Sequence, residues 1–522
     1  MTKSLENSVI IIGAGHNGLV CANYLSIAGY KVRVLEARDV AGGGAVTSEF
    51  ATGFKVSGLA HLFHGLDPQI LKDIGLQSTD FELGPEVKTI ALAANGNHLL
   101  IGKDSVTGEA LSEEDKHAYK EFKQEYYGFA KALKPLLLNK PGRLKNMDRA
   151  DKFTFAKVGW GLRFGLGVDA MREFLRVGGI NIYDVLNEKI ENPHLKGAIS
   201  VDAVMGHHMG PRTPTTVLTY LTRLSGEVQG NLSVPKNGMG RVTELLVDSA
   251  KSKGVEIQCG TAVQKILVDE GKAIGVQLES GEQLKANLIV SNADAKSTFL
   301  KLIDICELDA MFAQRINTTR THGNVAKFHF ALDDLPEFAG LATTDLGNRM
   351  LIAPDMRYVE HAFNHAKYRE FSTEPVIEIT MPSVHDGSLA PSGHHVMSVL
   401  ATFAPYDLKS GWSDQARQQF TDVVLKGIER YAPGITSKII ASELVTPVDI
   451  ENKFKISGGH WHHGEMAIDQ SFMMRPIHGT AQYNTPIEGL FLCGAAAHPG
   501  GGITGIPGRN AAKRISSLGR AG

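Results

Sequence analysis

Residues 9–18 read VIIIGAGHNG and carry the strongest structural signal in the chain. The four apolar residues predict a strand buried on both faces, as strands of parallel sheets are. A helix is expected after the glycines and ends at Gly29, and residues 31–36 predict a second strand. Strand, glycine-rich turn, helix and strand in this order indicate a βαβ unit of a Rossmann-like domain.

Each glycine of this GxGxxG pattern has its own role in binding a dinucleotide. Gly13 permits the tight turn, Gly15 lets the backbone approach a pyrophosphate, and Gly18 lets helix and strand pack closely. The helix N-terminus then offers free N–H groups and a partial positive charge to the phosphates. Glu36 ends the second strand, 23 residues after Gly13, where a carboxylate can accept hydrogen bonds from ribose hydroxyls.

The composition is that of an ordinary globular protein. The chain has 522 residues, 43% of them apolar and 21% charged, and this length predicts two to four domains. A net charge of −2 offers no general field for nucleic acid, which we therefore do not expect as a partner. The four cysteines form no CxxC, which disfavours a disulfide scaffold, a zinc ribbon and a redox dithiol. No targeting peptide or membrane span is recognisable, so we expect a cytoplasmic protein.

A second glycine run refines this interpretation. The segment LEARDVAGGG at residues 35–44 resembles the flavoprotein superfamily of amine oxidases and phytoene desaturases. The segments EGLFLCG at 488–494 and HPGGG at 498–502 resemble the flavin-end motif of that family, and residues 234–263 resemble its central segment. The family usually has arginine after the glycine pair, where this chain has Gly44, so any ionic contact from that arginine is absent.

The resemblance implies an α/β fold. It consists of a Rossmann-like FAD-binding domain assembled from discontinuous segments, with an inserted α+β substrate domain. The implied FAD-binding segments are residues 1–75, 231–300 and 481–522, and the substrate segments are 76–230 and 301–480. Only seventeen residues follow Gly505, too few for a second βαβ unit at the C-terminal glycines.

The motif and the resemblance together place a non-covalent FAD. The C-terminal glycine loop would lie against the isoalloxazine, and the helix after it would direct its positive end toward the flavin N1/O2 edge. The backbone of Val263 would lie against the adenine. The expected FAD-binding residues are Gly13, Ala14, Gly15, Asn17, Gly18, Glu36, Ala37, Arg38, Gly42, Gly43, Gly44, Val263, Gly494, Gly505 and Ile506.

Within the family, residues 43–47, 454–465 and 507–510 are most similar to the phytoene desaturase and carotenoid isomerase branch, and there to the pyridine nucleotide-disulfide oxidoreductase domain-containing group. The implied function is an FAD-dependent oxidoreductase of the dehydrogenase or desaturase type. It would take a hydride from an apolar small molecule and pass the electrons to an acceptor that is not identified: oxygen, a quinone or another molecule. Two alternatives stay open: a redox-neutral isomerase or hydratase, and a flavin-bearing protein that binds a partner with little catalysis.

Three histidine-bearing segments are expected near the flavin: residues 61–64, residues 460–463 and His498. His463 is the preferred general base, because Gly464 frees the backbone beside it and Glu465 could orient it; His61 and His498 are the alternatives. No metal is expected. The cluster lacks an HExxH motif or a cysteine partner, and His462 and His463 would point to opposite faces of a strand.

Residues 131–176 combine positive charge with aromatic side chains. Eleven Lys or Arg stand against four Asp or Glu, and five aromatic residues are interleaved with them. One interpretation is a solvated helical face. The other is a monotopic contact with an anionic membrane surface, which would make the protein peripheral to a membrane.

Overall fold

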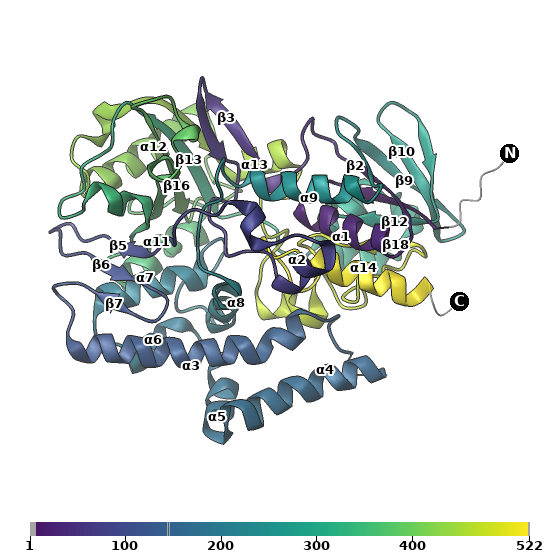
Figure 1. Ribbon diagram of the computed structural model, residues 1–522, viewed down its shortest axis with the longest axis horizontal. Coiled ribbons are helices and arrows are strands. Elements are labelled where there is room, and N and C mark those ends of the chain that lie inside the picture. The colour runs from purple at the N-terminus through teal and green to yellow at the C-terminus, as the bar shows by residue number, and fades with distance from the viewer. Residues whose placement is uncertain (1–6, 144, 146, 520–522) are drawn as a thin grey trace.

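The computed structural model describes residues 7–519 except 144 and 146, and two large sheets organise it (Figure 1). The strands are β1 Ser8–Ile12, β2 Lys31–Leu35, β3 Thr47–Ala51, β4 Phe54–Ser57, β5 Thr89–Ala91, β6 Leu99–Ile101, β7 Val106–Thr107, β8 Glu256–Gln258, β9 Val263–Asp269, β10 Lys272–Leu278, β11 Gln283–Lys285, β12 Leu288–Ser291, β13 Val325–Leu332, β14 Arg349–Ile352, β15 Val376–Thr380, β16 His395–Thr402, β17 Ile439–Val445 and β18 Leu490–Leu492. The α-helices are α1 His16–Ile27, α2 Pro68–Ile74, α3 Glu113–Leu137, α4 Arg149–Trp160, α5 Val168–Val177, α6 Ile182–Lys189, α7 Pro193–Val204, α8 Thr216–Gln229, α9 Gly240–Ser252, α10 Ala310–Asn317, α11 Met356–Lys367, α12 Asp414–Glu429, α13 Pro447–Phe454 and α14 Ile506–Gly519.

The first sheet is parallel and has the strand order β18-β12-β1-β2-β8. In β1, Ile10 pairs with Ile289 of β12 on one side and Arg33 of β2 on the other. Helices α1, α9 and α14 pack together beside this sheet, and a three-stranded antiparallel sheet, β11-β10-β9, adjoins it. The predicted α/β fold is confirmed, and the βαβ unit begins where the glycine motif predicts it.

The strands of the parallel sheet come from three distant segments: residues 8–35, 256–291 and 490–492. We propose the five sequence segments given above as the domain division, with one refinement. Helix α10 packs through Ala313 and Ile316 into the core of the parallel sheet, although it follows residue 300. The first domain therefore extends through α10.

The second sheet is mixed and has the order β17-β13-β16-β15-β14-β5-β6-β7. Its strand β14 shows how two cores form on opposite faces. Leu351 packs with helices α3, α6, α7, α8 and α11, whereas Met350 and Ile352 pack on the face that α12 covers. Alternate side chains of a strand point to opposite faces, so each face has its own helical layer.

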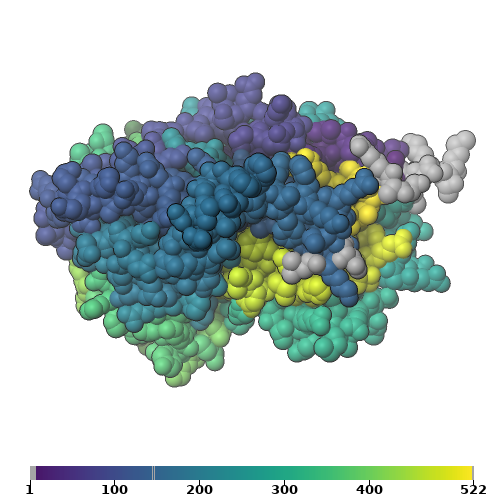
Figure 2. Space-filling model, turned by 90° about the horizontal axis from the view of Figure 1, so that it is seen from below, coloured from purple at the N-terminus to yellow at the C-terminus, as the bar shows by residue number. Residues whose placement is uncertain are grey.

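Helices α4 and α5 extend outward from beneath α3 (Figures 1 and 2). A short π-helical segment, Gly161–Leu166, joins them. None of the helices within the described residues is both long and apolar enough to cross a membrane.

Candidate functional site

One large cavity of about 900 Å³ is lined by residues of both sheets. It is lined by the first glycine motif, by the C-terminal glycine loop, and by residues of α7, α8, β14 and β15. A cofactor held by the glycine motifs would therefore share one space with the substrate region.

The first glycine turn leaves no room for side chains. Gly13 has a φ of +94°, and its N–H donates to the Leu35 carbonyl at 2.7 Å. A Cβ at Gly15 would lie 2.8 Å from Asn292 Nδ2, and one at Gly18 would overlap the carbonyl oxygen of Gly13. Gly13, Gly15 and Asn17 line the cavity, and α1 begins beside them. The turn therefore offers backbone and a helix N-terminus to a pyrophosphate.

Glu36 is buried at the edge of the cavity and holds the local backbone in place. Its carboxylate accepts the N–H of Ala14 at 2.7 Å and the N–H of Arg38 at 3.0 Å. A carboxylate has about four acceptor positions, so two stay available for ribose hydroxyls. Ala37 and Arg38 line the same wall.

The second glycine run closes over the first turn. The N–H of Gly42 donates to the carbonyl of Ala14 at 2.9 Å, and Gly43 and Gly44 line the cavity. A Cβ at Gly44 would lie 3.1 Å from Leu59 Cδ1. Leu59 therefore packs closely against Gly44, the position at which the resemblance implies an arginine in the family.

The remaining expected FAD contacts are Val263, Gly494, Gly505 and Ile506. Val263 lines the cavity. Ile506 lines the wall where α14 begins. Gly494 and Gly505 do not line the cavity but shape the loop: a Cβ at Gly494 would overlap the Asn292 carbonyl, and Gly505 has a φ of +73°.

These residues fit a dinucleotide cofactor. The buried Oδ1 of Asn17, which lines the cavity, has no hydrogen-bond partner in the protein. Glycines occupy the closest approaches, and one carboxylate stands at the expected ribose position. A buried acceptor without a protein partner is available for a hydrogen bond from a bound group.

His463 lines the cavity, but its surroundings differ from those expected from the sequence. Residues 460–463 form turns rather than a strand, and His463 has a φ of +58°. The prediction that His462 and His463 point to opposite faces of a strand is therefore wrong, since both line the cavity. Burial lowers the pKa of His463 to about 4, so the ring is neutral at neutral pH. Its buried Nδ1 has no hydrogen-bond partner.

The other two candidate bases have partners of their own. His61 lines the cavity and its Nε2 lies 2.7 Å from Glu378 Oε1, while burial lowers its pKa. His498 does not line the cavity. Its ring bonds the Leu136 carbonyl at 3.0 Å, and burial lowers its pKa to about 4. The structure thus brings His61 and His463 to one cavity and places His498 behind it.

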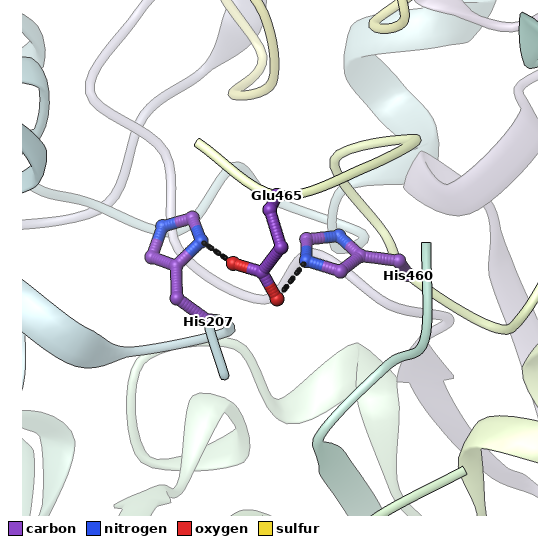
Figure 3. A group of neighbouring side chains, drawn as sticks. All are labelled: His207, His460 and Glu465. Carbon is purple, nitrogen blue, oxygen red and sulfur yellow. Dashed lines mark ion pairs between the residues drawn. The ribbon is translucent and has the colours of Figure 1, made fainter. Parts of the chain in front are cut away.

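Glu465 pairs with two histidines other than His463 (Figure 3). His207 Nδ1 lies 3.5 Å from one carboxylate oxygen, and His460 Nε2 lies 3.4 Å from the other. The expectation that Glu465 orients His463 is therefore not met.

His207, His460 and Glu465 are three buried groups that have the composition of a metal site. However, His460 Nδ1 accepts the N–H of His462 at 3.3 Å, which places the proton of the neutral ring on Nε2, the atom that faces Glu465 and that a metal ion would need unprotonated.

Sequence reasoning missed a charged cluster in the cavity wall, formed by Asp202, Arg349 and Glu378. The guanidinium of Arg349 donates from Nε to Glu378 at 2.6 Å, and its Nη2 lies 2.7 Å from Asp202. The two strands that supply Arg349 and Glu378 carry a signal that could have revealed the cluster. Each has a charged residue in an otherwise apolar segment: RMLI at 349–352 and VIEIT at 376–380.

Comparison with known proteins gives consistent matches. The model of the family "Flavin containing amine oxidoreductase" matches residues 18–516. The chain is 34% identical to the mouse protein "Pyridine nucleotide-disulfide oxidoreductase domain-containing protein 2", over 97% of this chain and 93% of that protein. It is 24% identical to a lycopene-forming phytoene desaturase of Pantoea ananas, over 95% and 96% of the two chains. An oxidoreductase from Methanosarcina mazei has a similar fold, with a TM-score of 0.61, 17% identity, and coverage of 98% and 100%.

Proposed function

The chain belongs to the family of flavin-containing amine oxidoreductases, is an FAD-dependent oxidoreductase, and on this premise we propose that it removes a hydride from a carbon atom of a largely apolar organic substrate. FAD supplies the hydride acceptor when it is bound. The observation that supports the proposal is the large cavity, in which Met205, Leu400 and Trp461 line the same space as the cofactor glycines. Apolar walls with few polar groups are typical of sites for small organic ligands.

The test is anaerobic mixing of the FAD-loaded protein with apolar alkenes, alcohols and amines, followed by the visible absorption of the flavin. We expect one class to bleach the flavin, and expect deuterium at the reacting carbon to slow the bleaching. Turnover of a substrate without net bleaching and without an acceptor would support a redox-neutral isomerase or hydratase instead. No bleaching by any class, with tight binding of a protein partner, would support a binding role.

We further propose that His463 accepts the proton that leaves the substrate when the hydride does. The neutral ring with a free Nδ1 can take a proton, and the nearby Asp294 carboxylate favours the charged form. His463→Gln should slow flavin reduction by about 100-fold while FAD content is unchanged. His498→Gln, outside the cavity, is the matched control. If His463→Gln reduces the flavin at the wild-type rate, another group accepts the proton.

For the protein's surroundings, we propose that α4 and α5 contact an anionic membrane surface. Phe153 and Trp160 of α4, Phe164 of the segment between the two helices, and Leu175 of α5 are 62–69% exposed. Residues 149–177 carry six Lys or Arg and three Asp or Glu. Exposed aromatic side chains among basic residues suit an interface with anionic lipid headgroups.

Co-sedimentation with vesicles tests this proposal. We expect the protein to sediment with phosphatidylserine vesicles but not with phosphatidylcholine vesicles, and expect salt to release it, since the screening length is about 8 Å at physiological ionic strength. Trp160→Ser should weaken binding. Tyr368→Ser, at an exposed residue outside α4 and α5, should not. Equal sedimentation with both vesicle types would refute the electrostatic part.

A further inference from the structure

Four side chains separate the large cavity from a smaller one of about 60 Å³: His64, Asp202, Arg223 and Arg349 line both. We call these four residues the shared wall. The smaller cavity is also lined by exposed residues, Glu86, Lys88 and Lys103, so it faces the protein surface. The shared wall is thus a point at which one end of a bound molecule would meet charged side chains.

Most charges around the shared wall already have a partner. Arg349 engages both Asp202 and Glu378. The second oxygen of Glu378 is held by His61, and Glu227 is held by Lys123 at 2.8 Å. Asp202, Glu227 and Glu378 are therefore each paired with a cation of the protein itself.

Arg223 is different. Its buried Nε has no hydrogen-bond partner, and Nε lies 3.6 Å from Asp202, whose carboxylate already faces Arg349. Its side chain is 30% exposed while it lines both cavities. A guanidinium presents five donors in a planar fork that matches a carboxylate. Arg223 therefore has capacity for an anion.

His64 adds a second unmatched group. Neither of its buried ring nitrogens makes a hydrogen bond of normal geometry with the protein. Burial lowers the pKa of His64 to about 3, so the ring is neutral and can donate one hydrogen bond. Buried polar atoms without protein partners are open to hydrogen bonds from another group, and Arg223 and His64 place two such side chains on one cavity wall.

We propose that Arg223 and His64 bind the carboxylate of the substrate, which is then an amphipathic carboxylic acid whose apolar part extends into the large cavity. This inference rests on the proposed function and names its substrate class. A buried carboxylate needs a paired cation, and Arg223 is the cation of the shared wall with an unmatched donor. The apolar part would pass Met205 and Leu400 toward the cofactor glycines.

Calorimetric titration of the FAD-loaded protein with decanoate and with decan-1-ol tests the proposal. We expect decanoate to bind at least about tenfold more tightly than the alcohol, since charge-assisted hydrogen bonds are the stronger ones. Arg223→Met should weaken decanoate binding by about 10- to 100-fold and leave decan-1-ol binding unchanged. Arg223→Lys, which keeps the charge without the fork, should fall between. Arg212→Met, at an exposed arginine just before α8, is the matched control.

Equal affinity for decanoate and decan-1-ol, or unchanged decanoate binding in Arg223→Met, would overturn the proposal. If Arg223→Met does not fold, Arg223→Lys and His64→Phe give the same readout, and wild-type affinity for decanoate in both would also overturn it. Calorimetry detects binding whether or not the flavin is reduced. Failure of the proposed hydride transfer would give a different pair of results. Decanoate would still bind in an Arg223-dependent way, but no class of compound would bleach the flavin.

Discussion

The two ends of the large cavity are built in opposite ways. At the cofactor end the closest surfaces are backbone, because Gly13 has a positive φ and a Cβ at Gly15 or Gly43 would press against neighbouring atoms. At the other end, charged side chains of Arg349 and Glu378 line the wall and depend on each other. The first end is therefore sensitive to added atoms, and the second is sensitive to lost charges.

Loss of a charge at the second end should have the largest effect. Arg349→Met removes the common cation of buried Glu378 and of Asp202, whose side chain is 17% exposed, and breaking a buried ion pair costs about 3–5 kcal/mol of the free energy of unfolding. Urea unfolding of the FAD-saturated protein measures this. Arg357→Met, at an exposed arginine, is the control and should change stability by less than about 0.5 kcal/mol. Similar free energies of unfolding for both variants would show that Asp202 and Glu378 do not depend on Arg349.

An added methyl group at the cofactor end comes next. Gly18→Ala places a Cβ against the Gly13 carbonyl, and such overpacking costs about 1–3 kcal/mol. The strain acts on the glycine turn that would hold the pyrophosphate. We therefore expect a larger fractional loss of FAD content after purification than of the free energy of unfolding. Gly159→Ala is the control, since no atom lies within 4 Å of its added Cβ. Full FAD content in Gly18→Ala would contradict the requirement for close packing.

Glu36 tests whether the cofactor end also uses a charge. Glu36→Gln keeps the side-chain shape but removes the negative charge that accepts the Ala14 N–H, so FAD should bind about 10- to 100-fold more weakly. Quenching of FAD fluorescence on binding gives the affinity. Glu279→Gln, at an exposed carboxylate that lines the same end, should change the affinity little. Equal losses in both variants would indicate a general electrostatic effect. The bound FAD should also be released by denaturation, as a non-covalent cofactor is.

The smallest effect concerns His463, between the two ends. Its folded pKa of about 4 lies below the 6.5 of an unfolded histidine, so the unfolded chain binds more protons between these values. Stability then falls as the pH drops from about 6.5 toward 4. His463→Gln should reduce this loss by about 1–2 kcal/mol at pH 5. Melting temperatures at pH 5 and 7 measure it; parallel losses in wild type and variant would contradict the low pKa.

The cofactor end could be predicted from sequence because its signals are local. Gly13, Gly18 and Glu36 lie within one βαβ unit, and each has a role set by backbone geometry. The charged end could not, since Asp202 of α7, Arg349 of β14 and Glu378 of β15 meet only through tertiary packing. For the same reason the sequence paired Glu465 with its neighbour His463, whereas the fold places it between His207 and His460.

The order of the chain also has a consequence for biosynthesis. The parallel sheet needs β18 beside β12, and α1 packs against α14, yet β18 and α14 are the last elements of the described chain. A nascent chain that has exposed its entire glycine motif at residues 13–18 therefore still lacks an edge strand and a covering helix. The cavity is complete only after these final elements have been translated, since residues 501–504 and Ile506 line it, and we expect the cofactor to bind after that point.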